Sequence, residues 1–177
     1  MVEFFKQQKF KTNTLIRNEK TVTLFPIILK IIFMAAINAY LTFNGNCEHA
    51  FDFYKSVFGG EFAMISKFKD IPPSDAKNLS REEGEKIMHV SFPISAETVL
   101  MGSDTPESYG VTAFGNNVSL SINADSREEA DRLFTGLSAG GQVSMPMENT
   151  FWGAYFGMFT DKFGIHWMVN FDEQPQQ

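Results

Sequence analysis

The sequence predicts an α+β fold made of two tandem βαβββ modules, and an internal repeat is the first observation behind this prediction. Residues Leu41–Asn44 recur about 80 positions later as Leu120–Asn123, and Gly59-Gly60 recurs as Gly140-Gly141. A repeat at a fixed offset predicts two copies of one structural unit. Between these landmarks each copy carries apolar residues at helical spacing, and three strand-like segments follow the glycine pair.

The helix of each module is predicted from an apolar stripe with spacings of three and four residues. The stripe runs from Ala50 to Phe58 in the first copy, with Asn46 as the expected cap, and from Ala130 to Leu137 in the second. Ser126 and Glu129 form a capping-box pattern ahead of the second stripe. The glycine pairs predict where the helices end, because glycine readily adopts the left-handed conformation of a C-terminal cap.

Each module should place one strand before its helix and three after it. We expect the later strands at residues 61–68, 86–93 and 97–103 in the first module, and at 141–145, 154–160 and 165–171 in the second. Asp161–Gly164 is the predicted turn before the last strand. In the segment 86–93, strict alternation would place Ile87, His89 and Ser91 on one face and Val90 on the other.

The remaining segments are expected to lie outside regular structure. Residues 69–85 form a charged loop rich in Pro, Ser and Gly, either a functional lid or a surface loop. Residues 104–117 are the expected linker, so module one spans 37–103 and module two spans 118–171. Asp104, at the linker, is expected to be a solvated loop acid. We interpret residues 1–33 as an N-terminal extension that is not native, ahead of a domain at 34–177.

Charge and cysteine content exclude several protein classes. The net charge is −6 although residues 1–33 carry +4, so the domain is acidic and unsuited to nucleic acid. The apolar stretch Thr21–Phe33 is interrupted by Lys30 and is too short to span a bilayer, although its basic lead also resembles a secretory signal. Cys47 is the single cysteine, which fits a cytoplasmic location and favours a structural role for this thiol.

Particular residues connect this architecture to a known family. They are Tyr40 to Cys47, the helix Ala50–Tyr54 with Phe58-Gly59-Gly60, and the stretch from Thr150-Phe151-Trp152-Gly153 through Asp161–Gly164 to Trp167. In this order they resemble the PhnB-like branch of the vicinal oxygen chelate superfamily, which includes glyoxalase I, extradiol dioxygenases, and fosfomycin and bleomycin resistance proteins. The resemblance covers Ile37–Phe171. It implies curled mixed sheets around a cup that binds a small molecule, in a homodimer.

The resemblance also brings two chemical expectations that the residues do not support. Members of this branch are often labelled demethylubiquinone methyltransferases, but no glycine-rich nucleotide loop follows a strand here. Metal-binding members of the superfamily hold an ion with His, Gln or Glu from four strands. Those positions fall here near Asn38 or Ala39, Met101 or Ser103, Ser119 or Ser121, and at Met168. None is a strong ligand for Zn, Ni, Mn or Fe, so we predict no metal and no cofactor.

The expected ligand-binding residues are mostly apolar, with a few polar anchors, as is usual for a small-molecule pocket: Tyr40, His89, Met101, Ser103, Phe151, Trp152 and Trp167. His89 is also the one candidate catalytic residue, because an imidazole facing the cup can act as acid or base. The alternative for His89 is a histidine on a solvated sheet surface. The alternative for the aromatic residues is packing in the core.

Two hypotheses for the function follow. The first is a metal-free binder of a small molecule, similar in plan to the antibiotic-sequestering members of the superfamily. The second is an enzyme of the lyase or isomerase type that acts on a small polar or aromatic metabolite through His89. A structural interaction protein is a third reading, which a solid interior without a cavity would favour. Neither nucleic acid nor a membrane is an expected partner.

Overall fold

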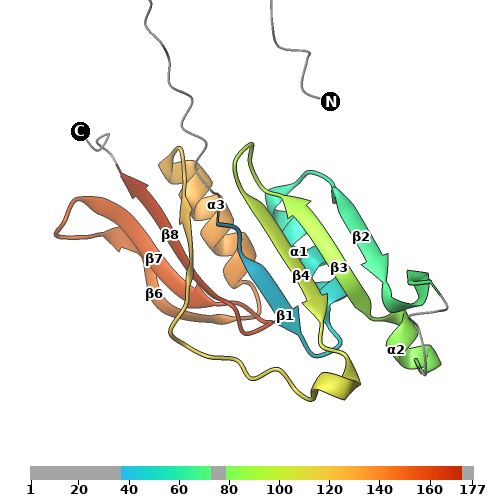
Figure 1. The fold of residues 1–177 in the computed structure, drawn as a ribbon. Coiled ribbons are helices and arrows are strands. Elements are labelled where there is room, and N and C mark those ends of the chain that lie inside the picture. Colours follow the sequence, from blue (N-terminus) through green and yellow to red (C-terminus); the bar gives the residue numbers. More distant parts are fainter. Residues whose placement is uncertain (1–36, 73–78, 173–177) are drawn as a thin grey trace, which may run out of the picture. The chain divides into compact units, whose positions relative to one another are not determined.

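The computed structural model describes residues 37–72 and 79–172, which contain two four-stranded sheets (Figure 1). Residues 1–33, the expected extension, lie outside the described residues. Sheet one has the strand order β1-β4-β3-β2, with β1 at Tyr40–Phe43, β2 at Met64–Lys67, β3 at Ile87–Pro93 and β4 at Val99–Asp104. Sheet two has the order β5-β8-β7-β6, with β5 at Leu120–Asn123, β6 at Gln142–Asn149, β7 at Ala154–Thr160 and β8 at His166–Asp172.

Both sheets are mixed and have the same topology. β1 pairs with β4 in parallel, and β5 pairs with β8 in parallel, whereas the other neighbours are antiparallel. Each parallel pair joins the first and last strand of a module, as the long connection through a helix allows. Neither sheet closes into a barrel. The predicted α+β fold of two βαβββ modules is confirmed.

The helix of module one, α1 (Cys47–Phe58), begins at an aspartate from another strand. Asn46 makes no capping hydrogen bond with its side chain. Asp104 instead accepts hydrogen bonds through Oδ1 from the backbone N–H groups of Gly45 at 2.8 Å and Cys47 at 3.0 Å. The expectation of a solvated Asp104 was therefore wrong, because this carboxylate is 2% exposed and neutralises the first N–H groups of α1. The helix ends at Gly59, whose φ of 78° lies in the left-handed region.

The helix of module two, α3 (Arg127–Ser138), begins as the sequence predicts. The Ser126 hydroxyl accepts a hydrogen bond from the Glu129 backbone N–H at 3.1 Å. The Glu129 carboxylate accepts a second bond from the backbone N–H of Asp125 at 2.9 Å, one residue ahead of the cap. The two hydrogen bonds satisfy backbone N–H groups around the first turn of α3. They therefore fix where this helix begins.

Three further short helices occupy segments that were expected to be irregular. The segment 69–85 contains most of a 3₁₀ turn, Phe68–Asp70, and all of α2 (Arg81–Glu85). Ser80 and Glu83 form a capping box at α2, a sequence signal that the loop assignment overlooked. The linker holds a 3₁₀ turn at Glu107–Tyr109. No helix in the described residues is long and apolar enough to cross a membrane.

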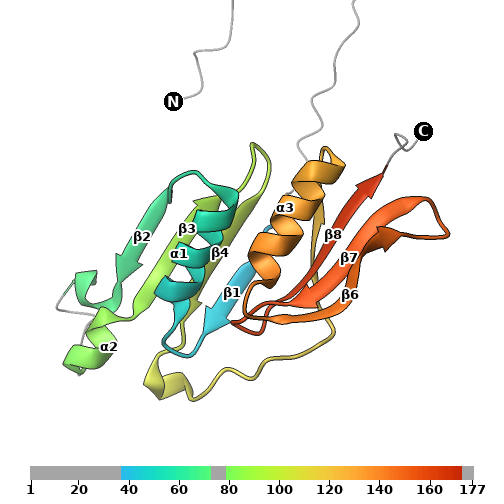
Figure 2. The ribbon, with the colours of Figure 1, turned by 180° about the vertical axis from the view of Figure 1, so that it is seen from behind.

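Each helix covers one face of its own sheet and leaves the other face open (Figure 2). Against α1, sheet one buries residues from alternate positions: Phe43, Val90, Phe92 and Leu100. Ile87 joins them in the core, against the strict alternation predicted for this strand, because the register between β2 and β3 shifts at Ser66 and Lys67. His89 and Ser91 remain on the opposite face.

The two modules share one hydrophobic core through the helices. The Tyr54 ring on α1 packs edge-on against the Trp167 ring of β8, with centroids 5.6 Å apart. Gly136 of α3 approaches Val57 of α1 so closely that a Cβ built on the glycine would lie 2.8 Å from a Val57 methyl. Because only glycine permits this approach, the helix–helix contact depends on a residue with no side chain.

Candidate functional site

The open face of sheet one, defined as the face turned away from α1, gathers four of the predicted ligand-binding residues. Tyr40 is paired with Met101 across β1 and β4, and the next pair along is Thr42 with Ser103. His89 lies on β3, the strand next to β4, on the same face. Pairing and alternation thus bring Tyr40, His89, Met101 and Ser103 together from three adjacent strands.

Tyr40 and His89 form the centre of this open face. Their rings are stacked, with centroids 5.7 Å apart and an interplanar angle of 25°. The Tyr40 hydroxyl and His89 Nδ1 lie 3.3 Å apart within hydrogen-bond reach. In the tautomer where Nδ1 is the acceptor, Tyr40 donates and Nε2–H remains available to a ligand. Tyr40 is 48% exposed, so the stacked pair presents its surface to solvent.

The other three predicted residues belong to module two. Phe151 and Trp152 lie in the turn between β6 and β7, 97% and 56% exposed, with their rings edge to face. Trp152 also contacts the ring of Phe156, which lies on the open face of sheet two. Trp167 lies on the helix side of sheet two and is only 2% exposed. The seven residues therefore form no single cluster within one chain.

The open face of sheet two mirrors that of sheet one in position but not in chemistry. Cross-strand pairing places Ser121, Met168 and Met158 in one row and Asn170 with Phe156 in the next. His166 lies at the end of this face, where Nδ1 is 2.9 Å from the Thr160 hydroxyl and Nε2 is 3.2 Å from the Gly115 carbonyl oxygen. Because both ring nitrogens contact the protein, His166 holds the linker against β8 rather than facing a ligand.

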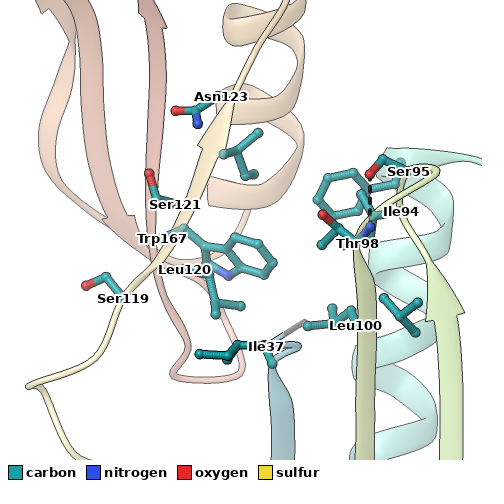
Figure 3. A pocket seen from close by; sticks show the side chains of 14 residues that line it. Ile37, Ile94, Ser95, Thr98, Leu100, Ser119, Leu120, Ser121, Asn123 and Trp167 are labelled. Atoms are coloured by element: carbon teal, nitrogen blue, oxygen red, sulfur yellow. Dashed lines mark hydrogen bonds between the residues drawn. The ribbon is translucent and has the colours of Figure 1, made fainter. Parts of the chain in front are cut away.

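A cavity of about 430 Å³ lies between the two modules (Figure 3). We call it the inter-module cavity. Its walls come from Ile37 and Ala39 just ahead of β1, the hairpin between β3 and β4, the end of α1, and strands β5 and β8. Trp167 projects into it from β8, and Leu120 projects from β5 (Figure 3). Sequence reasoning could not find this cavity, because it depends on how far apart the two modules sit.

Two buried groups near the helices are structural rather than reactive. Burial raises the pKa of the Cys47 thiol, and the charge of Asp104 beside it raises it further, so the nucleophilic thiolate does not form at neutral pH. Burial likewise raises the pKa of Tyr54, which donates a hydrogen bond to Asp161 Oδ2 at 2.7 Å. Asp161 also accepts from Trp167 Nε1 at 2.9 Å. The Tyr54–Asp161 bond joins module one to module two.

The residues at the superfamily's metal positions do not fit a metal. Met101 and Ser103 lie on the open face of sheet one, and Ser121 is paired with Met168 on the open face of sheet two. Thioether and neutral hydroxyl groups are weak donors for the divalent ions that imidazole and carboxylate hold. Within residues 37–72 and 79–172, no cluster of three or more His, Cys, Asp or Glu side chains could hold a metal ion.

Comparison with known proteins identifies the family. The family model described as 3-demethylubiquinone-9 3-methyltransferase matches residues 35–170. The chain belongs to this family. It is the PhnB-like branch of the glyoxalase/bleomycin resistance/dioxygenase superfamily, as the sequence motifs predicted. Its methyltransferase description is a label of the family model and shows no activity for this chain.

Relatives within the PhnB-like family share the whole domain. Protein YjdN from Escherichia coli is 31% identical over 148 residues, covering 80% of this chain and 99% of YjdN. The crystal structure of PA1353 from Pseudomonas aeruginosa is 41% identical, with a TM-score of 0.69, and the match covers 78% of this chain and 98% of PA1353. The PhnB protein from Bacillus cereus is 26% identical, with a TM-score of 0.61, over 76% of this chain and 98% of its own.

Proposed function

We propose that this PhnB-like protein is a metal-free binder of a small molecule, and that the ligand lies on the open face of sheet one. The observation that carries the proposal is the stacked, solvent-facing pair of Tyr40 and His89. A planar ring can stack on the Tyr40 ring, and the hydroxyl of Ser103 and the imidazole of His89 supply hydrogen bonds. The ligand expected there is a planar, polar aromatic molecule.

The protein would act as a homodimer, with the partner completing the site. Tyr40, His89, Met101 and Ser103 line one open face, while Phe151 and Trp152 are exposed at the β6–β7 turn of the other module. A large exposed aromatic pair is costly in a monomer and typical of an interface. A two-fold pairing that lays module two of one copy over module one of the other would bring both sets together twice. Trp167 would then support the site from the core.

The location of the ligand is tested by fragment binding measured with ligand-observed NMR. A panel of hydroxylated and heterocyclic aromatic fragments is screened against the native chain and the His89→Ala variant. The matched control is His49→Ala, because His49 is exposed on α1, on the covered side of sheet one. We expect fragment affinity to fall about tenfold in His89→Ala, the loss of one buried polar contact, and to stay unchanged in the control. Equal fragment affinity in both variants would show that the ligand does not bind on this face.

The metal-free part of the proposal has its own test. Metal analysis of the untagged protein, followed by thermal denaturation with Zn²⁺, Ni²⁺ and Mn²⁺, should show no stoichiometric metal and no rise in Tm. Any ion that binds the folded state raises Tm by mass action. A stoichiometric ion with a raised Tm would overturn the binder hypothesis and restore the metal chemistry of the superfamily.

An enzyme of the lyase or isomerase type is the second candidate. It is favoured by the free Nε2 of His89 on an open face, where an imidazole can move a proton. The fragments that bind should then be converted to product over hours by the native chain and left intact by the His89→Ala variant.

A cytoplasmic location is also proposed, supported by the single, unpaired Cys47.

A further inference from the structure

We propose that the inter-module cavity is a second ligand site, for a neutral and largely apolar molecule of two or three rings. This site is separate from the open face of sheet one and does not depend on the function proposed there. The cavity has a volume of about 430 Å³. An apolar cavity of roughly 150 Å³ accepts one benzene molecule. The inter-module cavity therefore has room for about three such rings.

The lining of the inter-module cavity disfavours a charged ligand. Large apolar side chains contribute from both modules: Phe58 and Leu100 from module one, and Leu120, Ile122 and Trp167 from module two. The polar side chains of the lining are Ser, Thr and Asn, and no lining residue carries a charge. An ionised ligand would lose part of its hydration on entering without gaining a counter-charge from the lining, which is unfavourable. A neutral ligand meets no such penalty.

A few polar groups can orient the ligand. The Thr98 side chain lies at the cavity wall opposite Trp167 (Figure 3). Five consecutive residues, 119–123, line the other side. Since neighbouring side chains of a strand point to opposite faces, part of this lining must be the backbone of β5. β5 is an edge strand that pairs with β8 alone, so its outer edge can exchange hydrogen bonds with one hydroxyl, carbonyl or N–H group of a ligand.

N-Phenyl-1-naphthylamine is the probe that tests this site, because it is neutral, has three rings and carries one N–H. In the Trp152→Phe variant Trp167 is the single tryptophan, so energy transfer to the bound probe reports proximity to the cavity. We expect saturable binding of one probe per chain with quenching of Trp167. Anilinonaphthalene sulfonate, the same ring system with a sulfonate, should bind about tenfold or more weakly. Equal affinity of the two probes would overturn the proposal.

Blocking variants locate the probe. Thr98→Phe adds a ring at the cavity wall, whereas the matched control Ala96→Phe adds the same ring in the same exposed hairpin but outside the lining. Probe affinity should fall about tenfold in the first and change less than about twofold in the second. Ala39→Phe adds a ring to the cavity from the residue just before β1 and should act like Thr98→Phe, so the result does not depend on the folding of one variant alone. Unchanged affinity in both blocking variants, or a tenfold loss in His89→Ala, would place the probe elsewhere.

Discussion

Replacing Tyr54 by Phe should loosen the contact between the modules at a predictable cost. The Tyr54 hydroxyl donates to Asp161 Oδ2 at 2.7 Å, and Asp161 is 3% exposed. Phe keeps the ring packing and removes one hydrogen bond to a buried carboxylate, a bond that contributes about 1.5–3 kcal/mol. We expect the free energy of unfolding to fall by about 2 kcal/mol. For a chain of this size, Tm should fall by about 4–8 °C.

Asp161→Asn perturbs the same contact from the other side. The amide oxygen can still accept from the backbone N–H groups of Phe163 and Ile165, which lie 2.8 and 3.0 Å from Oδ1. The amide N–H₂ would face the Trp167 indole N–H, which leaves that buried donor without an acceptor. An unpaired buried donor costs about 1–3 kcal/mol, and the remaining hydrogen bonds to residue 161 no longer involve a charged acceptor. We therefore expect the free energy of unfolding to fall by about 3–4 kcal/mol in this variant.

The assay is equilibrium urea unfolding of both single variants and of the double variant, followed by tryptophan fluorescence. Because Tyr54 and Asp161 share one bond, the two losses should fall short of additivity by about 0.5–3 kcal/mol. Tyr155→Phe is the control, since Tyr155 donates to Asp131 at the same distance of 2.7 Å but at the surface, where removal changes stability by less than about 0.5 kcal/mol. Additive losses, or a Tyr54→Phe chain as stable as the control, would refute the coupling of the modules through Asp161.

Four further outcomes follow from the buried groups. Asp104→Ala leaves three backbone N–H groups without their acceptor. The free energy of unfolding, measured in urea, should therefore fall by more than about 3 kcal/mol. Cys47 should react with a disulfide reagent at pH 8 about a hundredfold more slowly in the folded chain than in urea, since burial raises its pKa. Gly102→Ala should cost about 1–3 kcal/mol in thermal unfolding, because its Cβ would lie 2.6 Å from the Phe51 ring. Burial and the Asp161 charge raise the pKa of Tyr54 in the folded chain. The stabilising contribution of the Tyr54 hydroxyl is therefore complete below the unfolded pKa of about 10 and is lost as the pH rises above it. Between about pH 9.5 and 11 the free energy of unfolding should fall more in the native chain than in Tyr54→Phe.

Local patterns in the sequence were enough to predict the fold and most elements. The apolar stripe ahead of Gly59 and the Ser126 cap locate α1 and α3, because helix periodicity and capping are short-range properties. Alternation was enough to separate His89 and Ser91 from Val90, but only the structure shows that His89 lies on the face away from the helix. Alternation failed at Ile87 in the same strand, because a register shift depends on the partner strand as well as on the strand itself.

Long-range hydrogen bonding is the part that sequence patterns do not reveal. Asp104 resembles any loop acid near a proline, here Pro106, yet its three donors come from residues far away along the chain: Gly45, Cys47 and Ile87. The expected cap, Asn46, has the right residue type in the right place, but Asp104 takes over its role because the parallel pairing of β1 with β4 brings the end of β4 to the start of α1. A cap supplied by a different strand has no local signature.

The candidate site also contains residues that local patterns bring together and residues that they do not. Tyr40, His89, Met101 and Ser103 meet because strand alternation puts them on one face. Phe151 and Trp152 lie in the other module, and in the proposed homodimer they join this face from the partner chain. The helix-facing sides of the sheets hold the buried groups that stabilise the fold, including the Tyr54–Asp161 contact between modules. The open faces hold none of these groups. Changes such as His89→Ala should therefore leave Tm within about 2 °C of the native value, the usual range for surface substitutions, while binding on the open face is weakened.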